Sequence, residues 1–127
     1  MEMIENFSQH QVDDFLNESF QLTQLLIEKI LQNYDPDQIS RFVEVSSLLS
    51  QAVLPKGHSL REQVRNQHIG LLSILKALAS ATENQDTIAQ EELINYELRD
   101  NLTQWKINLL PLLKKAQSES RSILIQS

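Results

Sequence analysis

Residues 87–118, TIAQEELINYELRDNLTQWKINLLPLLKKAQS, decide the fold of this chain. Asp86 stands just before them and is a favourable N-cap residue, so a helix is predicted to begin at Thr87. Apolar residues then recur every three or four positions, the spacing of a helix that packs one face against its neighbours in a bundle. This core seam is predicted to comprise Leu98, Leu102, Trp105, Leu109 and Leu112, flanked by Ile94 and Ala116.

Pro111 falls within this long helix. Proline lacks a backbone N–H and its ring clashes with the carbonyl of Ile107, so a kink or a short break is expected there. Residues 119–127 are predicted to be frayed. Their apolar cluster, Ile123 to Ile125, could dock on the bundle or on a second copy of the chain.

Three further amphipathic helices are predicted over about 9–33, 36–53 and 59–82. The first places Val12, Leu16, Phe20, Leu26, Ile30 and Tyr34 on one face. Asp35, Pro36 and Gln38 match an N-cap, a first-turn proline and a capping box, and Ser59 with Glu62 matches a second capping box. Because the connections are short, successive helices should run antiparallel. The fold class is therefore all-α: one domain over residues 1–127, an up-down four-helix bundle with a Pro-kinked fourth helix.

Composition supports helices and narrows the class of protein. The 127 residues include only two glycines, too few for the many tight turns of a sheet protein. The absence of cysteine excludes disulfides and thiolate metal sites, and it suits a reducing compartment. The acidic N-terminal stretch is not a secretory signal, and no apolar run is long enough to cross a bilayer. We therefore expect a cytoplasmic protein with no membrane partner.

The net charge of −6 is unevenly distributed. Residues 1–54 hold nine acidic and two basic side chains, a balance of −7, whereas the remainder holds eight acidic and nine basic ones, a balance of +1. No basic stripe is present, so nucleic acid is not an expected partner. The simpler interpretation of the acidic half is a solvated face, but it also offers a surface for a basic protein.

One basic cluster stands beside a helix start: Lys56, His58, Arg61 and Arg65. Unpaired backbone N–H groups and the helix dipole could hold an anion there, although a solvated loop is the simpler interpretation. His68 lies on the apolar line of its helix and is interpreted as a boundary histidine with one hydrogen bond rather than as a catalytic acid or base. Gly70, in the same helix, marks a close helix contact or has no special role.

Metal and cofactor sites are not expected. No Glu-x-x-His pair of the di-iron bundles occurs, and His58, four residues before Glu62, precedes the predicted cap. The carboxylates of Glu91, Glu92, Glu97 and Asp100 are interpreted as a solvated helix face.

Residues 71–105 contain Leu93-Ile94-Asn95-Tyr96-Glu97-Leu98, a Leu-x-x-Tyr-Glu-Leu pattern that comes after a leucine-rich helix and a short Asn/Asp turn. This stretch resembles small bacterial all-helical proteins of unknown function, and the resemblance implies no activity or site residues. In size and helix count the chain is also similar to flagellar type III export chaperones. The predicted function is a non-catalytic protein-interaction module: an adaptor, chaperone or regulatory bundle, with a protein partner and a possible homodimer. The alternative is an anion- or nucleotide-binding bundle, or an enzyme, that uses the basic cluster.

Overall fold

A computed structural model describes the backbone of residues 9–126 and the side chains of residues 11–119. Three helices, α2 (Gln9–Gln32), α3 (Pro36–Val53) and α4 (Ser59–Glu83), precede a long fourth helix. The fourth helix is continuous and consists of α5 (Thr87–Glu92), the π-helical η1 (Leu93–Leu98), α6 (Arg99–Gln104), the π-helical η2 (Trp105–Leu109) and α7 (Leu110–Gln126). The predicted helix boundaries are thus confirmed to within a residue or so, except at the C-terminal end.

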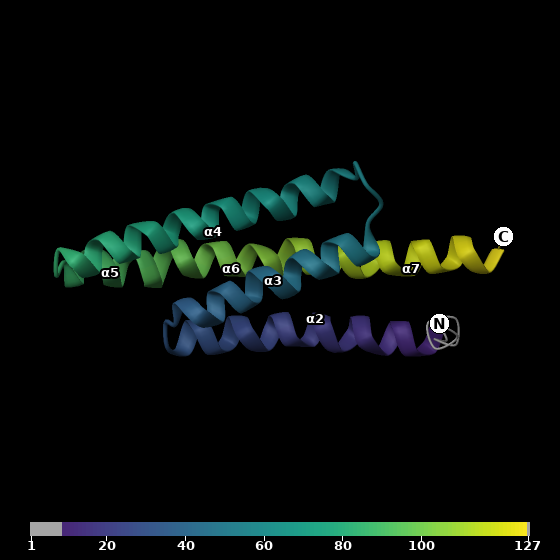
Figure 1. Ribbon diagram of the computed structural model, residues 1–127, viewed down its shortest axis with the longest axis horizontal. Coiled ribbons are helices and arrows are strands. Elements are labelled where there is room, and N and C mark those ends of the chain that lie inside the picture. Colours follow the sequence, from purple (N-terminus) through teal and green to yellow (C-terminus); the bar gives the residue numbers. More distant parts are fainter. Residues whose placement is uncertain (1–8, 127) are drawn as a thin grey trace, which may run out of the picture.

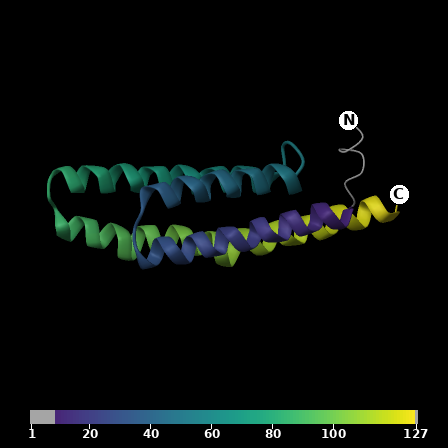
Figure 2. The same ribbon diagram turned by 60° about the horizontal axis from the view of Figure 1, so that its bottom comes forward.

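The helices form the predicted up-down bundle, in which successive helices run antiparallel and pack against each other (Figure 1). At one end α2 lies beside α7, and at the other end α4 and α5 extend beyond the turn that joins α2 to α3 (Figures 1 and 2). The molecule therefore has a four-helix part and a projecting two-helix part, which we call the hairpin and define as residues 72–97.

The helix starts show which capping signals the chain uses. Asp35 accepts a hydrogen bond from the backbone N–H of Asp37 (3.0 Å), and Asp86 accepts one from Ala89 (3.1 Å), as expected of N-cap residues. The capping box predicted for Asp35 and Gln38 is not completed, because Oε1 of Gln38 has no hydrogen-bond partner among the described residues. The N-cap predicted for α4, Ser59, was wrong. The N-cap is His58, whose Nδ1 accepts a hydrogen bond from the backbone N–H of Leu60 (3.1 Å). The extended backbone of His58 brings its ring over the first turn, so Ser59 becomes the first helical residue.

The two π-helical segments correct the seam predicted for the fourth helix. Leu98, Leu102, Trp105 and Leu109 are buried as expected, but Leu112 is 42% exposed, and Leu110 and Leu113 are buried in its place. A π-helical turn holds more residues than an α-helical turn, so it rotates every later residue about the axis. Extrapolation across η2, from Trp105 to the position seven residues later, therefore points to Leu112, whereas Leu113, eight residues later, is the buried one.

The irregularity expected at Pro111 takes the form of η2, which ends two residues before it. The wider turn includes Ile107, whose carbonyl the proline ring would otherwise crowd. The helix continues through Pro111 without a break and reaches Gln126, so the backbone of residues 119–126 is helical rather than frayed. The side chains of Ile123 to Ile125 lie outside the described residues.

The core lies where all four helices meet. Trp105 is fully buried at its centre, edge-on to Phe42 with ring centroids 5.5 Å apart. Its indole Nε1–H donates to the Thr23 hydroxyl (3.0 Å), and that hydroxyl donates to the carbonyl of Phe20 (2.7 Å). One side chain thus joins the fourth helix to α2 and α3. Val12, which was predicted to face this core, is 41% exposed.

Candidate functional site

An apolar groove runs along the outside of the α2–α3 pair and has a volume of about 220 Å³. Phe15 and Leu48 form its rims and are 64% and 63% exposed. The lining positions run from 15 to 22 on α2 and from 45 to 52 on α3, so the groove follows two turns of each helix. Its full lining is Phe15, Leu16, Ser19, Leu22, Val45, Leu48, Leu49 and Ala52. Large apolar side chains gathered around a concavity are typical of an interaction surface.

Sequence reasoning missed this groove because it sought one buried stripe per helix. Phe15 and Leu22 lie beside the buried row of α2, and Val45 and Leu48 lie beside the buried row of α3. Each pair keeps helical spacing, so each helix carries a second, partly exposed apolar row. That second row is the signal that predicts the groove.

Charged side chains border the groove. Glu18 lies one turn from Phe15 and from Leu22 on α2, and Glu44 lies one turn before Leu48 on α3. Both glutamates are exposed. Arg41 lies one turn before Val45 and Glu44 directly before it, so the Val45 end of the groove carries one base and one acid, whereas Glu18 lies midway along α2.

The basic cluster at the start of α4 is only partly assembled as an anion site. The Arg61 guanidinium donates to the carbonyls of Leu54 (2.7 and 3.2 Å) and Gln51 (3.2 Å), at the C-terminal end of α3. A cation there is favoured by the negative end of the helix dipole. His58 caps α4, so both residues already serve the chain itself.

Arg61 and Arg65 do meet around one small cavity of about 170 Å³. Lys56 and His58 do not line it. The other lining residues are Ser47, Ser50, Gln51, Val64 and His68. Of the four predicted anion ligands, the structure therefore brings two together and adds serine hydroxyls that were not predicted.

His68 is buried and bonded to two serines of α3. Its Nε2 lies 2.7 Å from the Ser46 hydroxyl, which also lies 2.7 Å from the carbonyl of Phe42 and 3.2 Å from that of Val43. Its Nδ1 lies 3.4 Å from the Ser47 hydroxyl, so both ring nitrogens contact a serine of α3. Burial lowers the pKa of His68, which favours the neutral ring.

This arrangement does not suit a nucleophile. A nucleophilic serine must reach a substrate, whereas Ser46 has no exposed surface. His68 makes two hydrogen bonds rather than the single one predicted, and the second is long. Its position on a buried helix face agrees with the sequence-based interpretation.

Gly70 marks a close contact between α4 and α6. A Cβ atom at Gly70 would lie 3.2 Å from Nδ2 of Asn101. That amide donates to the Gln67 carbonyl (3.1 Å), and the Gln67 side chain donates back to Oδ1 of Asn101 (3.0 Å). We call this reciprocal pair the amide clasp. The close helix contact considered for Gly70 is therefore present.

The amide clasp borders a shallow groove of about 600 Å³ whose lining is mostly carboxamide. The lining residues are Gln63, Asn66, Gln67, Asn101, Gln104, Asn108, Leu109 and Leu112. Among the described side chains, Oε1 of Gln67 is a buried acceptor without a hydrogen-bond partner. This atom is itself covered by protein, so it does not offer a ligand contact to the groove.

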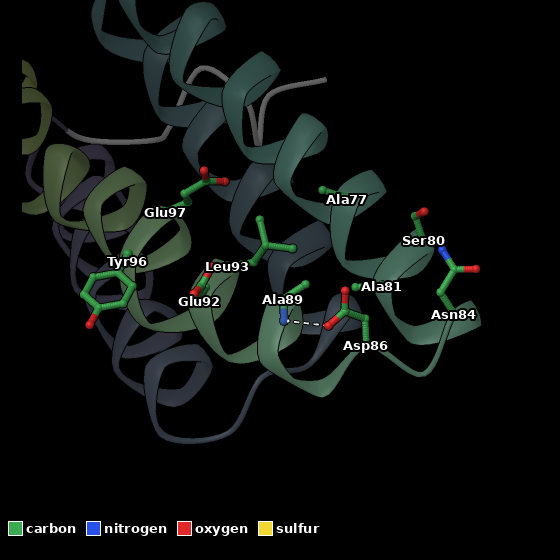
Figure 3. A pocket seen from close by; sticks show the side chains of 10 residues that line it. All are labelled: Ala77, Ser80, Ala81, Asn84, Asp86, Ala89, Glu92, Leu93, Tyr96 and Glu97. Carbon is green, nitrogen blue, oxygen red and sulfur yellow. Dashed lines mark hydrogen bonds between the residues drawn. The ribbon is translucent and has the colours of Figure 1, made fainter.

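A fourth hollow, of about 540 Å³, lies in the hairpin between α4 and the start of the fourth helix (Figure 3). Small side chains such as Ala77, Ala81 and Ala89 leave this space, and Tyr96 turns away from α4. The Asp86 carboxylate is engaged by the N–H of Ala89. Glu91, Glu92, Glu97 and Asp100 are exposed, in agreement with a solvated face. Within the described part of the chain, no cluster of three or more His, Cys, Asp or Glu residues could hold a metal ion.

No protein-family model, curated protein or solved structure matches this chain. The resemblance of residues 71–105 to small bacterial helical proteins, and the likeness to export chaperones, therefore stay predictions. Among the described helices, none combines the length and the apolar character that a membrane span requires.

Proposed function

We propose that this chain is a cytoplasmic, non-catalytic protein-interaction module, an adaptor, chaperone or regulatory bundle. The groove between α2 and α3 carries the proposal, because it leaves Phe15 and Leu48 largely exposed around a concave apolar lining. Exposed apolar side chains are common singly, whereas a cluster around a groove is typical of a binding surface. The complete burial of Ser46 beside His68 supports the non-catalytic part of the proposal.

Affinity capture from extracts of cells that produce this chain tests the proposal. The full-length protein is compared with a Phe15→Ser, Leu48→Ser double variant and with an Ile88→Ser control. Ile88 is even more exposed but lies on α5, away from the groove. We expect a protein that the wild type and the control retain and that the groove variant loses. Identical retention by all three proteins would contradict the proposal.

A second candidate function is the binding of a small oxyanion, favoured by the cavity that Arg61 and Arg65 share with serine hydroxyls. Arg65→Gln tests it more cleanly than a change at Arg61, because Arg61 also caps α3. If the cavity binds anions, inorganic phosphate or ATP should raise the melting temperature of the wild type and should not raise that of the variant. An equal response of both proteins would remove this candidate.

A further inference from the structure

We propose that the groove between α2 and α3 binds a basic amphipathic helix of a partner protein. This inference rests on the proposed function and adds the chemistry of the partner. It draws on the shape of the groove, the charge around it and the consequence of pairing the same face with itself.

The shape of the groove fits a row of side chains better than a small molecule. Its volume of about 220 Å³ is below the roughly 300–1,000 Å³ of typical small-molecule sites. It follows two turns of two antiparallel helices, from Phe15 and Ala52 at one end to Leu22 and Val45 at the other. A helix with apolar residues at i, i+3, i+4 and i+7 presents a matching row.

The charge around the groove favours a basic partner. The described residues up to 54, which comprise α2, α3 and their connections, hold seven acidic and two basic side chains, a balance of −5. Glu18 and Glu44 lie one helical turn from the exposed rims, well within the screening length of roughly 8 Å at physiological salt. Lysine or arginine beside the apolar row of a partner would pair with these carboxylates and speed the encounter.

A second copy of the chain is the less suitable occupant. A two-fold dimer through this groove would place the same surface on both sides. The acidic surface that carries Glu18 and Glu44 would then face the same acidic surface of the other copy. Their repulsion would oppose the burial of Phe15 and Leu48, so a partner of opposite charge is favoured.

The experiment uses the full-length chain and two fluorescein-labelled peptides of about 18 residues, long enough for a helix to form on binding. One peptide carries leucine at i, i+3, i+4 and i+7 with lysine elsewhere, and the other replaces each lysine with glutamate. Fluorescence anisotropy at low and high ionic strength gives the Kd values. We expect the basic peptide to bind at least about tenfold more tightly than the acidic one, with affinity falling as salt rises.

Two double variants locate the binding on the groove. Phe15→Ser with Leu48→Ser should weaken binding of the basic peptide about tenfold or more, because both apolar rims are lost. Glu18→Gln with Glu44→Gln should weaken it about threefold to tenfold at low salt and much less at high salt. Circular dichroism spectra and melting temperatures are compared with those of the wild type to show that each variant is folded.

Matched controls remove the same groups from the other end of the molecule. Ile88→Ser removes an exposed apolar side chain of α5, and Glu91→Gln with Glu92→Gln removes two exposed carboxylates. Both controls should keep the Kd of the basic peptide within about twofold of the wild-type value. A control effect as large as that of the groove variants would show that the peptide responds to net charge alone, and the proposal would be wrong.

The remaining outcomes separate this inference from the function on which it rests. Equal binding of both peptides in the groove would overturn the basic partner but keep an interaction surface. Unchanged binding by Phe15→Ser, Leu48→Ser would overturn the groove as the site. Sedimentation could also reveal a dimer of the wild type that the Phe15→Ser, Leu48→Ser variant does not form. A second copy of the chain would then occupy the groove, and the proposal would be overturned. Failure of the proposed function itself appears in affinity capture, where groove variant and wild type would retain the same proteins.

Discussion

Where all four helices meet, Phe42, Leu102 and Trp105 are completely buried, whereas the hairpin of α4 and α5 buries much less. Between Leu71 and Leu98, a stretch that the structure describes throughout, the buried residues are Leu78 and Ala81. The turn between α2 and α3 lies short of the hairpin (Figure 1). Ile74, Leu75 and Ile94 still pack against the core, but beyond them an apolar row has one helix to pack against instead of three. The two parts have the same helical periodicity in their sequences but bury different amounts of it. The hairpin should therefore be less stable than the four-helix part.

The largest expected effect is in the four-helix part. Trp105→Ala should lower the free energy of unfolding by about 3–5 kcal/mol, because it empties the centre of the core. A domain of this size has only about 6–15 kcal/mol in total. Urea unfolding followed by far-UV circular dichroism measures the change. Ile107→Ala, at an exposed position on the same helix, should change the free energy by less than about 0.5 kcal/mol. A loss below about 1 kcal/mol for Trp105→Ala would contradict the central role of this residue.

A smaller effect is expected in the hairpin. Leu78→Ala should cost about 2 kcal/mol, the low end for a buried leucine, because two helices alone can close over the space. Hydrogen exchange should quicken in residues 72–97 and stay slow around Trp105, since the hairpin can open by itself. Faster exchange throughout the bundle would show that the two parts are one cooperative unit.

The pH dependence of stability sharpens the comparison at the α3–α4 contact. Burial lowers the pKa of His68 in the folded chain, so below pH about 6.5 the unfolded chain takes up a proton that the folded chain resists. His68 therefore makes its full contribution to the free energy of unfolding above that pH, and this contribution is lost as the pH falls below it. Urea unfolding at pH 7.5 and 5.5 should show this fall in the wild type and less of it in His68→Gln. An equal fall in His68→Gln would contradict the assignment.

The smallest effect is expected at Gly70, near the border of the two parts. Glycine to alanine at an open helical position gains about 1 kcal/mol. The added Cβ at Gly70 would lie 3.2 Å from the Asn101 amide, so we expect a net change within about 0.5 kcal/mol. In an Asn101→Ala background the gain should reappear, and urea unfolding of the four proteins gives this difference directly. A gain of about 1 kcal/mol for Gly70→Ala in the wild-type background would show that Asn101 moves aside without a cost in free energy.

Much of the fold could be predicted because local signals and packing agree. Asp35 and Asp86 cap the helices that they were expected to cap, and the seam from Leu98 to Leu109 is buried. Prediction failed at Leu112 because a π-helical turn carries no pattern of its own in the sequence, yet it changes which later residues face the core. It also failed at the start of α4, because serine is a much more frequent N-cap than histidine.

The candidate site was harder to predict. The basic cluster was found by its residue types, but sequence spacing does not show that Arg61 turns back to the carbonyls of α3. The groove at Phe15 and Leu48 depends on two helices that present their second apolar rows side by side. Which rows meet is set by the crossing of the helices, and this is a property of tertiary structure.

The hydrogen bond from Trp105 to Thr23 has a practical consequence. Trp105 is the single tryptophan of the chain, so its emission reports only on the place where α2 and α3 meet the fourth helix. Opening of the hairpin would leave this optical signal unchanged, while the loss of helix would register in the far ultraviolet. Two melting curves recorded on one sample would therefore coincide only if the molecule comes apart all at once.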